Sequence, residues 1–405
     1  MKILYITAQT PWGRGETFII EEMLALKKNN VTLSIIPRNP SKKIFHKEAK
    51  ELLENSIWLP LIDFKMAICF LRTLITKASL WKILGSVLIH SRNPWIFIKN
   101  LAVFPKSIFI AKIIRKENIE HVHVHWGSTT ATMGYIISKI TGIPWSFTLH
   151  RWDIKENNIL KEKVKSAEFV RCISEHGKNE LIKIIGNKFL KKIRVIHLGV
   201  KIPDENILKL SKQKTDKIFK IITPANLIEV KGHKYLIEAI SCLINRGIKN
   251  LKCTFYGNGP FEKKLEKLIK KNRLIDYIKI HKAIPHEELI EIYKNKEINL
   301  VVLPSINTKD GQHEGIPVSL MEAMAYRIPV ISTNTGGISE LLSNDAGIMV
   351  QEKNPKEIAR AIEYLIEHPE EGKKMGKNGK KAVLEKYNWE NENKKLLDIY
   401  EKLLK

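Results

Sequence analysis

Cysteine is scarce in this sequence, and its arrangement excludes several kinds of protein. The chain has 405 residues but only four cysteines, no two of which form a C-x-x-C pair: Cys69, Cys172, Cys242 and Cys253. Such wide spacing, mostly within apolar runs, argues against a disulfide scaffold and against a cysteine-based zinc or redox motif. We therefore expect reduced, buried thiols in a cytoplasmic protein.

The sequence also lacks a long apolar run. A membrane-spanning helix needs about 20 predominantly apolar residues, and Arg72, Lys77 and Lys82 interrupt the best candidate. The first apolar run, Ile3 to Ala8, is too short for a signal peptide and predicts a strand instead. We therefore expect a protein that is not integral to the membrane.

Acidic residues are outnumbered by basic ones, 43 to 68, which gives a formal net charge of +25 at pH 7. An excess of this size is typical of proteins that bind nucleic acids. The lysines, however, are spread over nearly every predicted helix, and no DNA- or RNA-binding motif occurs, so we expect no nucleic acid partner. A basic surface also suits anionic membranes and anionic sugar nucleotides.

One region concentrates this basic character. Residues 61–119 carry ten Lys and Arg against only Asp63 and Glu117, with tryptophans and phenylalanines interleaved. Basic helices with aromatic residues can lie on an anionic bilayer. In the alternative, the aromatic residues form a core and the lysines a solvated face. We favour contact with an anionic membrane surface, which predicts peripheral attachment to the inner face of the cell membrane.

Short β-branched runs alternate with helical patterns along the chain, which predicts an α/β fold with parallel sheets. The length suits two domains. We predict an N-terminal domain over residues 1–200 and a charge-rich linker over residues 201–217. A C-terminal domain over residues 218–385 and a terminal helix over residues 386–405, which crosses back onto the first domain, complete the chain.

The most informative stretch is residues 303–341, where an apolar strand leads through a polar loop into an apolar helix. Pro317 suits the first turn of that helix, where a missing N–H costs nothing. A buried helix start favours an anion, and Glu314 lies on the loop at that start. Glu322 is the only charge in the helix before Arg327, so its carboxylate should be paired or bound to a ligand. Periodicity alone is equally compatible with an ordinary βαβ unit whose acidic residue favours the helix dipole.

The run EGIPVSLMEAMA, followed by PVISTNTGGISEL, resembles the E-x(7)-E signature of retaining glycosyltransferases of family 4. The resemblance implies the GT-B fold, in which two Rossmann-like domains face each other across a deep cleft, the first binding the acceptor and the second the nucleotide sugar. It implies a retaining hexosyltransferase that moves a sugar from a UDP- or GDP-sugar to a hydroxyl of a glycan or polyprenyl-diphosphate-linked oligosaccharide. The products would be exopolysaccharide, capsule or lipopolysaccharide, and neither a metal nor another cofactor is expected.

The resemblance also assigns residues to the donor. Glu314 would bind hydroxyls of the donor sugar, and Glu322 would bind the ribose. Lys231 matches a lysine that holds the diphosphate, but Asn226 stands where the family has an arginine, which removes one positive charge. The donor-binding residues implied in this way are Gly13, Gly15, Asn226, Lys231, Glu314, Gly315, Ile316, Pro317, Val318 and Glu322. His150, Lys231 and Glu314 are the expected catalytic residues.

Three N-terminal motifs complete the resemblance. TPWGRGETFIIEEMLAL resembles a loop over the donor phosphates that faces the acceptor, and HVHWGSTTA resembles a strand-end motif that lines the cleft. These motifs place Glu16, His125 and Trp126 at the acceptor. WSFTLHRWD matches the family's T-x-H-G-x-D, in which His150 would contact the donor sugar, but Arg151 replaces the glycine and leaves the shape of the loop open.

Three alternatives follow from the residues themselves. His121, His123 and His125 alternate along one strand, so their side chains share a face and could bind zinc. No cysteine or nearby acidic residue in the sequence completes such a site, so we expect no metal. A sugar-nucleotide epimerase could share the architecture, although the E-x(7)-E run and the Lys231 loop argue against it. Asn226 favours a third alternative, a degenerate protein that binds sugar nucleotide without catalysis.

Overall fold

The computed structural model describes residues 1–13, 16–44, 46–210 and 218–403. The chain divides into two compact units, residues 1–196 with 393–405, and residues 197–392. The predicted donor residue Gly15 and residues 211–217 of the predicted linker lie outside the described residues.

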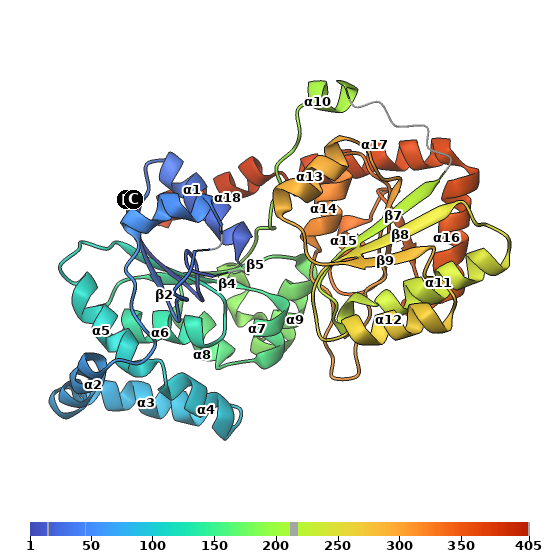
Figure 1. Cartoon of the computed structure of the whole chain (residues 1–405). Coiled ribbons are helices and arrows are strands. Elements are labelled where there is room, and N and C mark those ends of the chain that lie inside the picture. The colour runs from blue at the N-terminus through green and yellow to red at the C-terminus, as the bar shows by residue number, and fades with distance from the viewer. Residues whose placement is uncertain (14–15, 45, 211–217, 404–405) are drawn as a thin grey trace. The chain divides into compact units, whose positions relative to one another are not determined.

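The first unit, most of which runs from blue to green in Figure 1, is built on a parallel sheet of six strands. The strand order is β2-β1-β3-β4-β5-β6. Its strands are β1 (Lys2–Thr7), β2 (Thr32–Pro37), β3 (His121–His125), β4 (Trp145–Leu149), β5 (Phe169–Cys172) and β6 (Ile193–Val195). Its helices are α1 (Thr17–Lys28), α2 (Phe64–Thr76), α3 (Ala78–His90), α4 (Pro94–Leu101), α5 (Phe104–Ile114), α6 (Thr129–Thr141), α7 (Arg151–Glu156), α8 (Leu160–Ser166) and α9 (Glu175–Ile185). Short 3₁₀ helices cover Glu48–Asn55 and Asn187–Lys192, and most of α18 (Trp389–Leu403) also belongs to this unit.

Both faces of this sheet are covered. Leu4 and Ile6 of β1 pack into a core with residues of α5 and α6, whereas the alternate residues Ile3 and Tyr5 pack with α1 and with Tyr400 of α18. Strands that are buried on both faces read as continuous apolar runs, which is why β1 looked like a short apolar segment in the sequence.

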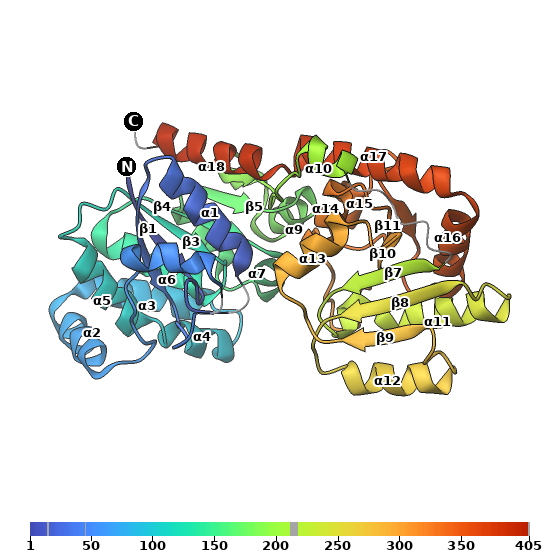
Figure 2. The same cartoon turned by 45° about the horizontal axis from the view of Figure 1, so that its top comes forward.

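The second unit has its own parallel sheet of six strands, in the order β12-β11-β10-β7-β8-β9 (Figure 2). Its strands are β7 (Phe219–Pro224), β8 (Leu251–Tyr256), β9 (Ile278–His281), β10 (Leu300–Leu303), β11 (Val330–Thr333) and β12 (Ile348–Val350). Its helices are α10 (Glu205–Leu210), α11 (His233–Asn245), α12 (Glu262–Lys271), α13 (His286–Lys294), α14 (Val318–Ala325), α15 (Ile338–Leu341), α16 (Pro355–Glu367) and α17 (Pro369–Lys386), with a 3₁₀ turn at Glu229–Lys231. Ile221 and Ile222 of β7 belong to different cores, so this sheet is also covered on both faces.

The strand order of each sheet reverses once. β1 has β2 on one side and β3 on the other, and β7 has β8 on one side and β10 on the other. In open α/β sheets, ligands bind at the carboxyl ends of the strands beside such a switch point. The β1/β3 edge and the β7/β10 edge are therefore the places to look for a site.

The predicted α/β architecture with two parallel sheets is confirmed, but one local prediction was wrong. Pro317 does not lie in the first turn of a helix: it precedes α14 in an extended conformation, with φ −71° and ψ 119°, and Val318 is the first helical residue. The four cysteines form no disulfide, and Cys242 is the one that is partly exposed. Among the described residues, none of the helices combines the length and the apolarity that a bilayer crossing requires.

Candidate active site

Two loops are tied together at the β7/β10 edge of the second unit. The N–H of Ile306, after β10, donates to the carbonyl of Val230, after β7, at 2.8 Å. Gly232 ends the β7 loop with φ +67°, and a Cβ there would lie 1.8 Å from the carbonyl oxygen of Pro304. Only glycine fits both this backbone conformation and this close approach, so Gly232 fixes the two loops to each other.

Lys231 and Glu314 meet at this edge. Lys231 Nζ lies 2.5 Å from Glu314 Oε2, and their side chains are 17% and 7% exposed. The Ser305 hydroxyl donates to the same carboxylate oxygen at 3.2 Å. The sequence placed both residues on loops that follow strands, and the structure brings them together as a charge-assisted hydrogen bond with limited water access.

A third loop packs against the backbone of Glu314. The turn after β11 contains Gly336, which has φ +56°, and a Cβ there would lie 1.7 Å from the carbonyl oxygen of Glu314. A Cβ on Gly337 would lie 2.7 Å from a side-chain carbon of Ile316. The two glycines therefore allow the loop that carries Glu314, Gly315 and Ile316 to pack directly on this turn.

Glu322 lies in α14 and is held by a residue that the sequence did not reveal. His286 Nε2, at the start of α13, lies 2.7 Å from Glu322 Oε1. The His286 side chain is 60% exposed and that of Glu322 is 12% exposed. The predicted need for a partner is thus met, and the partner is a surface residue that a ligand can displace.

The remaining donor residues lie on the same loops. Asn226 is exposed on the loop after β7, where the next residue, Leu227, donates its N–H to the carbonyl of Asn258 at 3.0 Å. Gly315 faces open space, because no atom lies within 4 Å of where its Cβ would be. Val318 is the first residue of α14, and Pro317 precedes it as the N-cap.

Glu16 holds together the loop after β1 at the β1/β3 edge of the first unit. Its carboxylate accepts N–H groups of Gln9 at 2.8 Å and of Thr10 at 2.7 Å, the Thr10 hydroxyl at 2.8 Å, and the indole N–H of Trp126. The side chain is buried. Glu16 thus shapes the loop that also contains Gly13, and it connects that loop to the end of β3.

Trp126 follows β3 in an unusual conformation. Its φ of +96° lies in a region that non-glycine residues rarely adopt. Its indole stacks on the imidazole of His150, with ring centroids 4.3 Å apart and planes at 30°. Strained residues of this kind cluster at functional sites, so the strain at Trp126 supports a functional role for this edge.

His150 and His125 form a buried pair. Their Nε2 atoms lie 2.9 Å apart, and burial, followed by the neighbouring His125, holds the pKa of His150 well below its usual value. His125 Nδ1 faces the carboxylate of Glu22 at 3.7 Å. A carboxylate beside Nδ1 favours the tautomer with the proton on that nitrogen, which leaves His125 Nε2 to accept from His150.

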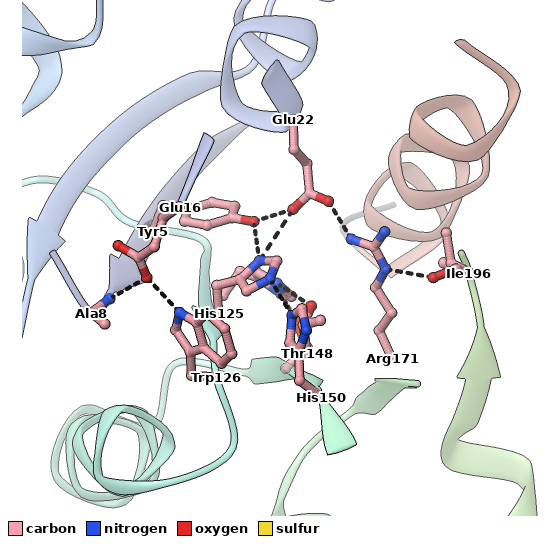
Figure 3. Close-up of polar contacts among 12 residues, drawn as sticks. Tyr5, Ala8, Glu16, Glu22, His125, Trp126, Thr148, His150, Arg171 and Ile196 are labelled. Carbon is pink, nitrogen blue, oxygen red and sulfur yellow. Dashed lines mark hydrogen bonds and ion pairs between the residues drawn. The ribbon is translucent and has the colours of Figure 1, made fainter. Parts of the chain in front are cut away.

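Glu22 of α1 is the centre of this buried network, as Figure 3 shows. It accepts hydrogen bonds from the Tyr5 hydroxyl and from Arg171 of β5, and Arg171 Nε donates to the carbonyl of Ile196 at 2.9 Å. Burial alone would raise the pKa of Glu22, but Arg171 and His125 together hold it well below its usual value. Sequence reasoning missed this network, because its members lie on four separate elements, β1, α1, β3 and β5.

Glu22, His123 and His125 are close enough to hold a metal ion, so the expectation that no acidic residue lies near these histidines was wrong. Their environment does not suit a metal, however. The guanidinium of Arg171 already neutralises Glu22, and His123 is engaged by the hydroxyls of Ser146 at 2.8 Å and of Thr148 at 3.1 Å. A dication would have to displace these contacts and lie beside a buried positive charge.

Arg151 does not distort the loop after β4. It is the first residue of α7 and has no positive φ, so the flexibility of glycine is not needed there. Asp153, two residues on, accepts the N–H of His150 at 2.9 Å. Burial raises the pKa of Asp153 to about 6, although the N–H groups of Gly127 and His150 partly oppose that shift.

Two family models match most of the chain. The model described as Glycosyltransferase Family 4 matches residues 16–202, and the model described as Glycosyl transferases group 1 matches residues 204–382. An uncharacterized glycosyltransferase of Methanocaldococcus jannaschii is 27% identical over 299 residues, which cover 72% of this chain and 78% of that protein.

A second relative and a solved structure extend the comparison. The amylovoran biosynthesis glycosyltransferase AmsK of Erwinia amylovora is 33% identical over 224 residues, so that the match spans about half of each chain, 53% in both cases. The structure of Anabaena Alr3699/HepE in complex with UDP-glucose has a TM-score of 0.72 at 15% identity and covers 99% of this chain and 100% of that one. At this identity the structural likeness concerns the fold alone.

Proposed function

Because this chain belongs to the family 4 glycosyltransferases and has their GT-B fold, we propose that it is a retaining enzyme that transfers a hexose from a UDP- or GDP-sugar to a hydroxyl of a glycan or polyprenyl-diphosphate-linked oligosaccharide. The observation that carries this proposal is the Lys231–Glu314 pair at the β7/β10 switch point. The relative AmsK, which is named for amylovoran biosynthesis, supports a role in surface polysaccharide assembly.

The second unit binds the donor in this proposal. The bond between the anomeric carbon and the diphosphate breaks, a bond to the acceptor oxygen forms, and the acceptor proton ends on the leaving diphosphate. Lys231 and the backbone N–H groups of Ile316 and Val318 at the start of α14 stabilise the charge of that leaving group. Asn226 adds a hydrogen bond without charge, so most of the neutralisation depends on Lys231. These groups supply the required positive potential without a metal.

The two glutamates bind hydroxyl groups rather than attack the sugar. Glu314, whose side chain is 7% exposed, accepts hydroxyls of the donor sugar while Lys231 turns to the diphosphate. Glu322 exchanges its exposed partner His286 for the two hydroxyls of the ribose. Gly315, which faces open space, lets the sugar approach the backbone.

The first unit receives the acceptor. His150, with its low pKa, is a neutral hydrogen-bonding group at the end of β4, and Trp126 offers an apolar face beside it. His125 acts through His150, and Glu16 acts by fixing the loop after β1 and the indole of Trp126.

An apolar surface supports the proposed attachment to the membrane. Among the described residues, eleven of the nineteen exposed large hydrophobic side chains lie between Trp58 and Leu101, so exposure is concentrated there rather than spread over the chain. We name the part on α2, α3 and α4 the apolar patch: Phe64, Leu71, Ile75, Trp81, Leu88, Ile89, Trp95, Ile98 and Leu101. Within each helix these residues recur at spacings of one helical face. Together with the lysines and arginines of residues 61–119, they suit the inner, anionic face of a cell membrane, which is consistent with a cytoplasmic enzyme.

A donor screen tests the function directly. Thermal shifts with UDP- and GDP-sugars should identify one nucleotide that stabilises the protein, and that sugar nucleotide should be hydrolysed slowly without an acceptor and transferred when an acceptor is present. Binding without hydrolysis or transfer would indicate a non-catalytic protein, and formation of an epimer would indicate an epimerase. Absence of any shift with either nucleotide would overturn the proposal.

The membrane attachment has a separate test. The protein should float with liposomes that contain anionic lipid, and the bound fraction should fall as salt is raised. Ile75→Ser and Ile89→Ser, which act on the apolar patch, should reduce flotation, whereas Leu384→Ser, an exposed residue of α17, should not. Equal flotation of all three variants would show that the apolar patch is not the contact.

A further inference from the structure

A groove of about 590 Å³ lies in the first unit, between the carboxyl ends of its strands and α4. Ala8, Arg38, Trp126 and Trp152 enter it from the segments that follow β1, β2, β3 and β4, and Trp95 enters it from α4. The volume is within the range of small-molecule sites. Because four strand ends contribute, the groove lies at the same edge of the sheet as His150.

The groove is positively charged. Four basic residues line it, Arg38, Arg92, Lys99 and Lys155, against two acidic ones, Asp153 and Glu156. Lys99 is paired with Glu156 at 3.1 Å. The net charge favours an anionic ligand, and the two arginines have the fork geometry that phosphate groups accept.

Arg38 is held in place as a binding group. One of its terminal nitrogens donates to the Thr129 hydroxyl at 2.5 Å. The buried Lys106 donates to the carbonyls of Pro37 at 2.6 Å and of Arg38 at 2.9 Å, which fixes the backbone. Within the described part of the chain, the buried Nε of Arg38 has no hydrogen-bond partner. A buried N–H without a partner favours a ligand acceptor.

The groove borders the apolar patch. Trp95 and Lys99 line the groove, and on the same helix Trp95, Ile98 and Leu101 are exposed, with Trp95 at 64%. A molecule with an anionic head and a long apolar chain could therefore satisfy both surfaces at once. A free sugar or a free inorganic anion would use only one of them.

We propose that this groove binds the diphosphate head of a lipid-linked acceptor, with Arg38 and Arg92 on the phosphates and the lipid chain running over the apolar patch from Trp95. The assignment of the ligand as acceptor rests on the proposed function. The sugar that the head carries then lies beside Trp126, which lines the groove and stacks on His150. The enzyme would thus recognise the lipid diphosphate of its acceptor at a place distinct from the hydroxyl that reacts.

Farnesyl diphosphate is the probe, with inorganic pyrophosphate and farnesol as the head and chain alone. Calorimetry on the full chain should show farnesyl diphosphate binding more tightly than either fragment. Arg38→Gln and Arg92→Gln should each weaken it about tenfold or more, as expected when a charged hydrogen bond is lost. Trp95→Ser should weaken farnesyl diphosphate but not pyrophosphate. Lys161→Gln, which removes an exposed charge of α8 outside the groove, should change nothing, and thermal melts should show that each variant is folded.

Each other outcome overturns the inference. If pyrophosphate binds as tightly as farnesyl diphosphate, the groove recognises only the phosphates. If farnesol binds as tightly, the groove recognises only the apolar chain. Unchanged binding in both arginine variants would place the ligand elsewhere. Binding of UDP to the same preparation separates the two proposals. If UDP binds and farnesyl diphosphate does not, the groove assignment fails while the proposed function stands.

Discussion

The two switch points place charged groups differently. At the β1/β3 edge of the first unit, Glu22 and Arg171 are 5% and 2% exposed and are bonded to each other. At the β7/β10 edge of the second unit, the Lys231 side chain is 17% exposed, and Glu322 is paired with a largely exposed histidine. A fully buried pair can only maintain the shape around it, because a lone buried charge is too costly. A pair that solvent reaches can exchange its partner for a ligand.

The comparison indicates a division of roles between the two edges. The first unit has a buried network that fixes the position of His150. The His150 imidazole is neutral, so it interacts through hydrogen bonds and ring contacts and not through a net charge. The second unit keeps Lys231 and Glu322 partly exposed, at 17% and 12%, which leaves a cation and a carboxylate that a charged diphosphate and a ribose can reach, although Glu314 itself is buried. Variants of the buried network in the first unit should therefore lose mainly stability, whereas variants of the site in the second unit should lose mainly turnover.

The largest expected effect is on the buried pair. Glu22→Ala should lower the free energy of unfolding by about 3–5 kcal/mol, because it leaves the Arg171 guanidinium buried without its carboxylate. Urea denaturation measures the change. The double variant Glu22→Leu with Arg171→Met removes both charges and should be clearly more stable than Glu22→Ala. Equal loss in the single and double variants would show that the ion pair is not the cause.

Lys231→Ala should have the opposite profile. Loss of one preorganised positive donor should reduce turnover by about 10²–10³-fold, while the free energy of unfolding falls much less than in Glu22→Ala. Lys234→Ala, an exposed neighbour on α11, is the matched control and should keep normal turnover. Near-normal turnover of Lys231→Ala would remove this lysine from the site.

Gly336→Ala tests the support behind Glu314. The new Cβ would collide with the Glu314 carbonyl, and displacement of a binding group by about 1 Å can cost roughly 100-fold in rate. Gly247→Ala is the control, because Gly247 also has a positive φ, +91°, but no atom lies within 4 Å of where its Cβ would be. If both variants lose activity equally, backbone strain rather than the collision is responsible.

The smallest effect concerns Asp153 and depends on pH. Its pKa is raised to about 6 in the folded protein, against about 3.9 when unfolded. The folded state therefore holds a proton that the unfolded state has lost, and stability contributed by Asp153 falls by about 1.4 kcal/mol per pH unit between these values.

Asp153→Asn should remove that dependence while its amide oxygen still accepts the His150 N–H. The variant should match the parent protein near pH 4 and become the more stable of the two as the pH rises to 6. Urea denaturation at a series of pH values measures this difference. Parallel stability profiles across that range would contradict the expectation.

Features that depend on the order of neighbouring residues along the chain could be predicted from the sequence. Alternating strand and helix patterns predicted both parallel sheets, and residues that follow strand ends, such as Lys231 and Glu314, necessarily gather at one sheet edge. Their direct contact needed the structure, because the switch-point order of β7 and β10 makes two loops adjacent that are far apart in the chain.

The features that the sequence did not reveal all depend on long-range packing. Glu22 reads as one of two adjacent acids on a helix, and only the sheet order brings it to Arg171 and His125. His286 reads as a surface residue at a helix start, until α14 places Glu322 opposite it. Glu16 looked like an acceptor-binding acid, and its contacts within the loop after β1 became visible only in three dimensions. Its direct contact with an acceptor stays a prediction.

Cys242 gives this protein a natural attachment point for a probe. It is the partly exposed one of four thiols that form no disulfide, and it lies ten residues into α11 from Gly232, which corresponds to about 15 Å along a helix. A maleimide dye should label it in preference to the buried thiols. Fluorescence from that dye would report nucleotide arrival at the glycine end of the same helix in the native sequence, without an engineered cysteine.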